Sequence, residues 1–425
     1  MSVESFDVAV IGTGPGGSVA SALLADSGCS VVAIEKDAFP RFHIGESLTG
    51  TAGEIIRKLG LADQMAANDF PDKPGVNVIG KDARNEFFVP VLNPTWQVRR
   101  STFDAMLRDT SRERGAVHRR GRVTRVLRRG DAVTGLSYLG EGETSETEIR
   151  ARVVIDASGQ SVLLSQQGIA GPRKIDHFSR QIAFFAYYEG VERDPGRFSA
   201  NTSIFYSEVH NWSWVIPISS TVDSVGIVIP QDVHRQLGKP SPEAAMEYGI
   251  ANINPELRSR MRNARRVEPV RACRDYSYRV DPFVGDGWLC VGDSHRFLDP
   301  IFSFGVSFSM SEAERAAGAI LEALETGDRL APFEAFAHWS DTGQGVAADL
   351  IRYFWKYPVF FGYQMQNTEI RDEVIRLFGG QCFKPDGMKT PKRFREALEK
   401  DDDSPQPIRD LRAPVPRELT AAASA

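Results

Sequence analysis

The sequence is poor in cysteine and histidine, the residues that build most structural metal sites in proteins. Its 425 residues include 4 cysteines and 7 histidines. The cysteines are widely separated, no Cys-x-x-Cys pair occurs, and no histidines cluster at metal-ligand spacing. These absences predict reduced thiols, a cytoplasmic location and no bound metal.

Long runs of like charge and long apolar runs are also missing. The formal net charge of -5 is spread along the chain, which leaves no basic surface for nucleic acid or an anionic membrane. No apolar run approaches the roughly 18 residues that a membrane span needs. The first apolar strand pattern, at residues 6–12, follows no segment that resembles a signal peptide. We therefore expect a soluble, unexported protein that binds neither nucleic acid nor membrane.

What the sequence does contain is a glycine pattern between two apolar strand patterns. Gly12, Gly14 and Gly17 form G-x-G-x-x-G at the end of FDVAVIG, and a small-residue helix pattern then leads to a second strand pattern. This order is typical of a βαβ dinucleotide fold. Gly12 permits the tight turn, Gly14 lets a pyrophosphate approach the backbone, and Gly17 lets helix pack on strand. Glu35, at the end of the second strand, is placed to accept a hydrogen bond from a ribose hydroxyl.

Two later motifs resemble the flavoprotein monooxygenase fold. DASG at 156–159 and GDSHRFLDP at 292–300 follow the glycine pattern in the order seen in that family. The resemblance implies FAD rather than NAD, with Asp293 at the flavin ribityl chain or ribose and Arg100 near the flavin. It also implies an α/β (α+β) fold, in which a Rossmann-like FAD-binding domain is interleaved with an antiparallel substrate sheet.

The expected domain boundaries follow from this similarity and from composition. A FAD-binding core spans residues 1–330, with the substrate-binding sheet at 74–98 and 176–275. Residues 331–400 are expected to form a helical segment that covers the substrate side. The charged, proline-rich residues 401–425 predict a disordered tail.

Further segments resemble the flavin-dependent halogenases, in the subgroup that acts on pyrrolyl or phenolic groups, often on a carrier protein. The matching segments are FPRFHIGESL (39–48), FPDKPGV (70–76), WSWVIP (212–217) and DPIFSFGVS (299–307). The resemblance implies that Lys73 is the reactive lysine. It also implies flavin contacts from four further residues, Arg41, Ser47, Gly305 and Val306.

The tryptophans of WSWVIP share one face of a strand, because residues two apart point the same way. Trp212 and Trp214, with Pro217 ending the strand, can form a packed sheet face or a wall that keeps the substrate from the flavin. In halogenases such a wall would let only a halide reach the oxidant that reduced flavin forms with oxygen. A separating wall is itself packed, so both interpretations can hold.

The loop ahead of the helix expected at 306–324 is the predicted halide site. The backbone amides of Phe304 and Gly305 offer neutral donors to chloride or bromide. The family usually has serine or threonine where Phe304 stands, so this sequence places a large ring close to the halide.

Lys73 can act on hypohalous acid by hydrogen bonding to it or by forming a chloramine, and either role favours a partly desolvated amine. The alternative is a solvated loop lysine, and Lys81 is a competing candidate in the same region. We interpret His43 and Glu46 as residues that pack over the flavin rather than as an acid–base pair.

The leading hypothesis is a natural-product halogenase that receives FADH2 from a separate NAD(P)H-dependent flavin reductase. It would use chloride or bromide to halogenate a pyrrole or phenol, free or on a carrier protein. The lack of a second glycine pattern for a nicotinamide cofactor favours this hypothesis. Two alternatives stay open: an FAD-dependent monooxygenase or reductase of the same fold, acting on a small aromatic or polyketide-type substrate, and a non-catalytic flavin-fold protein that binds a partner or a lipid chain.

Overall fold

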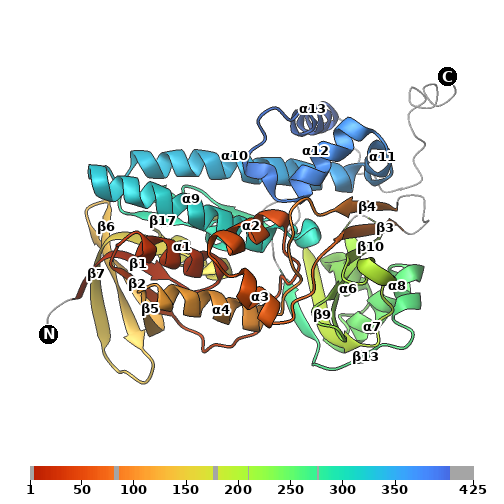
Figure 1. Ribbon diagram of the computed structural model, residues 1–425, viewed down its shortest axis with the longest axis horizontal. Helices are drawn as coiled ribbons and strands as arrows, with labels where there is room; N and C mark the ends of the chain where they lie inside the picture. Colours follow the sequence, from red (N-terminus) through yellow and green to blue (C-terminus); the bar gives the residue numbers. More distant parts are fainter. Residues whose placement is uncertain (1–3, 81–85, 176–179, 209, 275–276, 403–425) are drawn as a thin grey trace.

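Two large sheets, each covered by helices, lie side by side in the computed structural model (Figure 1). The structure describes residues 4–80, 86–175, 180–208, 210–274 and 277–402. The first sheet is mostly parallel and the second mostly antiparallel, and the chain passes between them several times. The expected α/β class, with a Rossmann-like layer interleaved with an antiparallel sheet, is confirmed.

The first sheet carries the glycine loop at the carboxyl end of its strand β1. β1 pairs in parallel with β2 and β7, β2 with β5, and β7 with β17, while β6 runs antiparallel between β5 and β7. Residues 8–11 of β1 are all buried, as expected for a parallel strand covered on both faces. Its strands are β1 (Glu4–Ile11), β2 (Val31–Glu35), β5 (Val117–Arg129), β6 (Ala132–Gly140), β7 (Glu146–Asp156), β16 (Val284–Gly285) and β17 (Trp288–Cys290).

The helices of this layer pack closely because small residues line their contacts. A Cβ atom on Gly16 of α1 would lie 2.3 Å from the Ser309 hydroxyl of α9, so only glycine lets these two helices approach. α1 also packs against α4, and α2 against α9. The helices are α1 (Pro15–Asp26), α2 (Gly50–Lys58), α3 (Ala62–Ala67), α4 (Arg100–Glu113), α5 (Leu163–Gln166) and α9 (Phe304–Thr326).

The second sheet has two differently covered faces. One face packs on helices α6 (Gln231–Gln236), α7 (Pro242–Asn252) and α8 (Pro255–Arg260), and the other carries the two tryptophans toward the C-terminal helices. Neighbouring strands run antiparallel except β3 and β10, which are parallel. Its strands are β3 (Gly75–Gly80), β4 (Phe87–Pro90), β9 (Gln181–Glu189), β10 (Thr202–Glu208), β11 (Asn211–Pro217), β12 (Val222–Pro230), β13 (Arg265–Arg266) and β14 (Arg271–Arg274).

The C-terminal helices lie above both sheets in Figure 1. They are α10 (Ala331–Lys356), α11 (Pro358–Gln364), α12 (Thr368–Phe378) and α13 (Thr390–Asp402). α10 packs along α9, and its last turns join the aromatic cluster on the tryptophan face of the second sheet. Helix α13 includes the first two residues of the predicted disordered tail, and residues 403–425 lie outside the described part of the chain.

A third, small sheet consists of β8 (Arg173–Ile175), β15 (Tyr278–Val280) and β18 (Arg296–Phe297), and it lies next to the Gly292–Ser294 turn. Within the described residues, no helix is both long enough and apolar enough to cross a membrane.

A first prediction concerns Gly226, which pairs with Trp214 across the second sheet. A Cβ atom at Gly226 would lie 2.1 Å from the indole ring, so Gly226→Ala should displace Trp214. We expect a loss of about 1–3 kcal/mol in the free energy of unfolding, the usual cost of overpacking. Urea unfolding measures it. The control is Gly318→Ala, in the exposed side of α9 with no atom within 4 Å of its Cβ position. A Gly226→Ala variant as stable as wild type would contradict the prediction.

Candidate functional site

The three positions of the predicted fingerprint are occupied by glycine for different structural reasons. Gly12 has a φ angle of +93°, which favours glycine, and a Cβ there would lie 2.6 Å from the carbonyl oxygen of Ala157. A Cβ on Gly17 would lie 2.0 Å from the carbonyl oxygen of Gly12. At Gly14, by contrast, the nearest atom is Arg41 Nη2, 3.6 Å away. Gly12 and Gly17 are thus required by packing, whereas Gly14 leaves room beside a guanidinium group.

That room suits the pyrophosphate of a dinucleotide. Helix α1 begins directly after Gly14, so its N-terminus favours an anion there, and Arg41 adds positive charge. The Glu35 carboxylate accepts hydrogen bonds from the Thr13 amide (2.8 Å) and hydroxyl (3.2 Å), and from the Asp37 amide (2.8 Å). Glu35 therefore ties the end of β2 to the glycine loop and keeps a carboxylate beside it, where a ribose would lie. These residues fit FAD.

Arg100, at the start of α4, is buried and its guanidinium group links α4 to the preceding 44–45 segment by hydrogen bonds. Its Nε and Nη2 donate to the Asp104 carboxylate at 2.7 and 2.9 Å, and its Nη1 donates to the Ile44 carbonyl at 2.5 Å. Arg41 Nη1 lies 3.5 Å from the same carboxylate. Arg100 thereby fixes the loop that was predicted to cover the flavin. Burial raises the pKa of Asp293 to about 7, although the Arg100 charge opposes this shift.

Asp293 borders a cavity of about 40 Å³ at the start of α9. A single water needs roughly 10–15 Å³, so the cavity can hold a small ion. Its lining includes Asp293, Asp299, Phe304, Gly305, Phe308 and Gln344. Lys73 and the two tryptophans of β11 are not among the residues that line it.

Two residues of the predicted halide loop, Phe304 and Gly305, line this cavity. Ser303 adopts a left-handed conformation (φ +60°), and α9 then begins at Phe304. The amides of Phe304 and Gly305 are the first of the helix and have no acceptor within it. A Cβ atom on Gly305 would meet no atom within 4 Å, so space lies above it. The Phe304 ring stacks on Phe308, with centroids 5.0 Å apart and planes 9° apart, and forms part of the cavity wall.

Lys73 is buried, with 6% of its surface exposed, so the interpretation as a solvated loop lysine is wrong. Its Nζ donates to the Leu48 carbonyl at 2.9 Å. Burial lowers the pKa of Lys73 to about 7, and at neutral pH much of the amine is therefore uncharged. The competing Lys81 lies outside the described residues.

Three extended segments hold Lys73 in place. Residues 46–48, 71–73 and 95–98 are linked by backbone hydrogen bonds and two isolated bridges. The Ser47 hydroxyl in this joint lies 2.7 Å from that of Thr202, on the second sheet, so it is engaged inside the protein. Val306 faces the neighbouring loop, since its Cγ2 lies 3.4 Å from a Cβ placed on Gly45.

The two tryptophans stand side by side, as predicted from their spacing. Their ring centroids are 5.7 Å apart, and 2% and 7% of the surfaces of Trp212 and Trp214 are exposed. The Trp214 indole nitrogen donates to the Ser224 hydroxyl at 3.2 Å, and Pro217 is the last residue of β11. This face is both a packed core and a continuous aromatic surface.

A buried carboxyl joins this surface to the loop predicted to cover the flavin. Glu46 accepts a 2.6 Å hydrogen bond from the Tyr187 hydroxyl, and burial raises the pKa of Glu46 to about 7. His43 hydrogen bonds with the Ile44 carbonyl, at 2.8 Å, and not with Glu46. Burial lowers the pKa of His43 to about 4. Tyr187 was missed from the sequence, because nothing in an alternating strand pattern marks which tyrosine meets a distant carboxyl.

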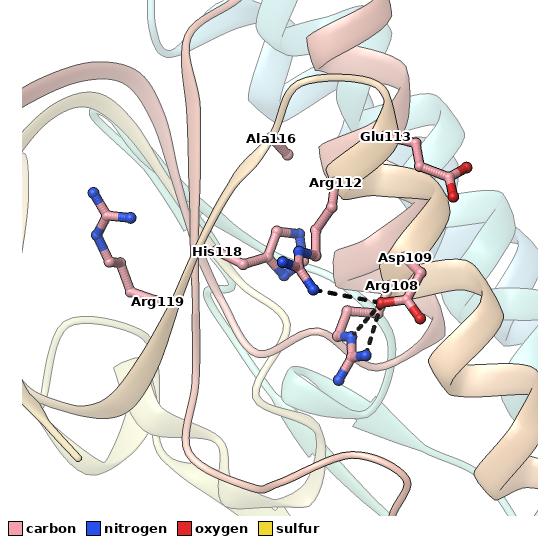
Figure 2. Close-up of a pocket in the computed structure, with 7 residues that line it drawn as sticks. All are labelled: Arg108, Asp109, Arg112, Glu113, Ala116, His118 and Arg119. Atoms are coloured by element: carbon pink, nitrogen blue, oxygen red, sulfur yellow. Dashed lines mark hydrogen bonds and ion pairs between the residues drawn. The ribbon is translucent and has the colours of Figure 1, made fainter. Parts of the chain in front are cut away.

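A larger hollow, of about 690 Å³, lies on the surface between α4 and β5 (Figure 2). None of the predicted site residues lines it. Arg108 and Arg112 lie 2.7 and 3.8 Å from the Asp109 carboxylate, so these charges are paired. Arg108 also stacks on Phe39, so the hollow borders the 39–48 segment from outside.

A second prediction tests the cofactor site. Gly14→Val should leave the fold intact, because no backbone atom lies within 4 Å of the Cβ position, but should fill the space for the pyrophosphate. We expect FAD affinity to fall about 100-fold, roughly the loss of one charge-assisted contact, measured by fluorescence titration. Gly345→Val, in α10, is the matched control, since a Cβ atom on Gly345 would also lie 3.6 Å from an arginine Nη2, that of Arg395. Equal FAD affinities for the two variants would contradict the site.

Comparison with known proteins agrees with this geometry. Residues 5–331 match a family model described as FAD binding domain. The chain is 56% identical over 399 residues to a 1H-pyrrole-2-carbonyl-[peptidyl-carrier protein] brominase from Pseudoalteromonas luteoviolacea, covering 94% of this chain and 98% of that one. It is 26% identical to the corresponding chlorinase from Pseudomonas fluorescens, over 94% of each.

Solved structures give the same result. The flavin-dependent brominase Bmp2 is 54% identical and superposes with a TM-score of 0.91, covering 94% of this chain and 99% of that chain. The myxobacterial chondrochloren halogenase CndH is 30% identical, with a TM-score of 0.77 and coverage of 93% and 96%. The chain therefore belongs to the FAD-binding domain family and, within it, to the flavin-dependent halogenases.

Proposed function

We propose that this halogenase brominates a pyrrole ring that is attached to a peptidyl carrier protein. The observation that carries the proposal is the buried Lys73 amine, which donates to the Leu48 carbonyl at 2.9 Å and whose pKa is lowered to about 7. The high identity to a brominase of carrier-bound pyrrole supports the substrate class. Reduced FAD, when bound, supplies with O2 the oxidation of halide to hypohalous acid.

The residues at the start of α9 are proposed to hold the halide. The Phe304 and Gly305 amides can donate to an anion without offering a nucleophile that the oxidant would attack. The adjoining wall is the stacked pair of Phe304 and Phe308. Bromide is less strongly hydrated and more polarisable than chloride, so an aromatic wall costs it less on entry. This argument favours bromide over chloride at this site.

Lys73 is proposed to act on the oxidant after it has left the halide site. As an ammonium, it can donate a hydrogen bond to hypobromous acid and polarise the oxygen–bromine bond. As a neutral amine, it can take the bromine as a bromamine and release water. A pKa near 7 makes both forms available at neutral pH. Trp212, Trp214 and Pro217 are proposed to keep the pyrrole on the lysine side.

Two partners belong to this proposal. A separate NAD(P)H-dependent flavin reductase would supply FADH2, because the sequence has a single dinucleotide fingerprint, at Gly12 to Gly17. A peptidyl carrier protein would deliver the pyrrole-2-carbonyl group, which is the carrier-bound substrate in the name of the P. luteoviolacea relative.

The test is mass spectrometry of products formed with FAD, a generic flavin reductase, NADH, oxygen and bromide or chloride. Free and carrier-bound pyrrole-2-carboxylate are offered in parallel. We expect the bromine isotope doublet on the carrier-bound pyrrole. Hydroxylated product without halogen would favour a monooxygenase and contradict the proposal.

A third prediction assigns the role of Lys73. Lys73→Met keeps an apolar side chain of similar length and removes the amine, so aromatic bromination should fall by about 100-fold or more, the scale of a lost catalytic group. Formation of hypobromous acid, measured with a chemical trap, should persist. Lys58→Met is the control, because Lys58 is exposed and paired with Glu314. Product formation by Lys73→Met at the wild-type rate would remove this lysine from the mechanism.

A fourth prediction uses the lowered pKa of Lys73. Between pH 7 and 10.5 the folded state binds fewer protons at this amine than the unfolded state does. Stability relative to the Lys73→Met variant should therefore rise with pH across this window. Urea unfolding of both proteins at several pH values measures the difference. A difference that falls as pH rises would mean that the amine has a raised pKa and a buried anionic partner.

A further inference from the structure

A buried carboxylate lies five residues before Phe304, in the turn that leads into α9, and joins three parts of the fold. Asp299 has 2% of its surface exposed. Its Oδ1 accepts the Ile301 amide at 3.1 Å, inside the loop itself. Its Oδ2 accepts the side-chain amide of Gln181 (3.2 Å) and the indole N–H of Trp355 (3.3 Å).

These partners come from separate elements. Gln181 is the first residue of β9 in the second sheet, and Trp355 is in the last turn of α10. Trp355 is itself fixed by packing, since its ring lies 5.1 Å from Phe354 and 5.0 Å from the His210 ring. The turn that leads into α9 is therefore attached through one carboxylate to the sheet and to the C-terminal segment.

We propose that Asp299 is a positioning residue for the halide site and that Trp355 completes it. This inference rests on the proposed use of halide at Phe304 and Gly305. Asp299 holds the 299–302 turn through the Ile301 amide, and the turn sets where the first amides of α9 point. Without Trp355, the carboxylate would keep one donor fewer from outside its own loop.

Charge compensation strengthens this assignment. Asp299 lines the same cavity as Phe304 and Gly305, and an unpaired carboxylate there would repel an anion. The N–H donors of Gln181 and Trp355 on Oδ2, and the Ile301 amide on Oδ1, compensate that charge. The His210 ring also faces this carboxylate, with its Nδ1 3.8 Å from Oδ2. A carboxylate can thus stand beside a halide site as long as all three donors stay in place.

A fifth prediction separates positioning from simple repulsion. Asp299→Asn keeps an acceptor for Ile301 but turns an amide N–H₂ toward the donors of Gln181 and Trp355. The bromide KM should rise about tenfold, the scale of one buried hydrogen bond lost, while kcat at saturating bromide and FAD affinity stay close to wild type. Trp355→Phe removes only the indole N–H that donates to Asp299 Oδ2. It should also raise the bromide KM.

Two matched control variants test whether any Asp→Asn or Trp→Phe substitution in this fold would change the bromide KM. Asp328→Asn changes an exposed aspartate that accepts the Leu330 and Ala331 amides in the same way. Trp339→Phe changes a tryptophan of α10 that stacks on Phe383, 4.3 Å away. Both controls should leave the bromide KM unchanged.

The outcomes are distinguishable. Bromide binding to the FAD-loaded protein is followed independently by the bromide NMR line width, so a wild-type protein that binds bromide but forms no brominated product would count against the proposed function alone. An unchanged or lower bromide KM in Asp299→Asn would overturn the positioning role, because a carboxylate that merely repels halide should improve the site when neutralised. A misfolded Asp299→Asn leaves Trp355→Phe as the deciding variant, and an unchanged KM there would equally overturn the inference.

Discussion

The backbone joint between residues 46–48, 71–73 and 95–98 is the constraint on which the rest of the site depends. It is built from main-chain hydrogen bonds, so its geometry is set by the chain path more than by side-chain choice. The segment at 46–48 comes from the dinucleotide layer, and the one at 71–73 leads into β3 of the second sheet. Because the joint lies between the two layers, it brings Lys73 next to the segment that carries Glu46 and Ser47, although Lys73 and its partner Leu48 are 25 residues apart in the sequence.

Burial, more than ion pairing, sets the protonation of the site. It lowers the pKa of the Lys73 amine and raises those of the Glu46 and Asp293 carboxyls, each to about 7. The directions differ because desolvation always disfavours the charged form, which is the cation for lysine and the anion for the acids. The flavin-dependent halogenase is thereby left with three groups that can change protonation near neutral pH. A pH profile of the whole reaction would therefore report more than one group.

The C-terminal helices belong to the site as well as to the core. The aromatic residues of α10 to α12 pack on the tryptophan face of the second sheet, and Trp355 reaches Asp299 beside the halide cavity. From the sequence, this aromatic segment reads as a covering layer. In the structure it also supplies a hydrogen-bond donor to the turn ahead of α9, so the placement of the C-terminal helices and of the halide loop cannot vary independently.

The sequence by itself determined the features whose cause is local. The φ angle of Gly12 and the close contact of Gly17 belong to one turn, and the shared face of Trp212 and Trp214 follows from a two-residue spacing, so each could be predicted without knowing what lies nearby. Only the tertiary structure decided the burial of Lys73, the pairing of Glu46 with Tyr187, and which side chains donate hydrogen bonds to Asp299. The physical reason is that desolvation and side-chain hydrogen bonds depend on which distant segments meet, and no single stretch of sequence encodes its own neighbours.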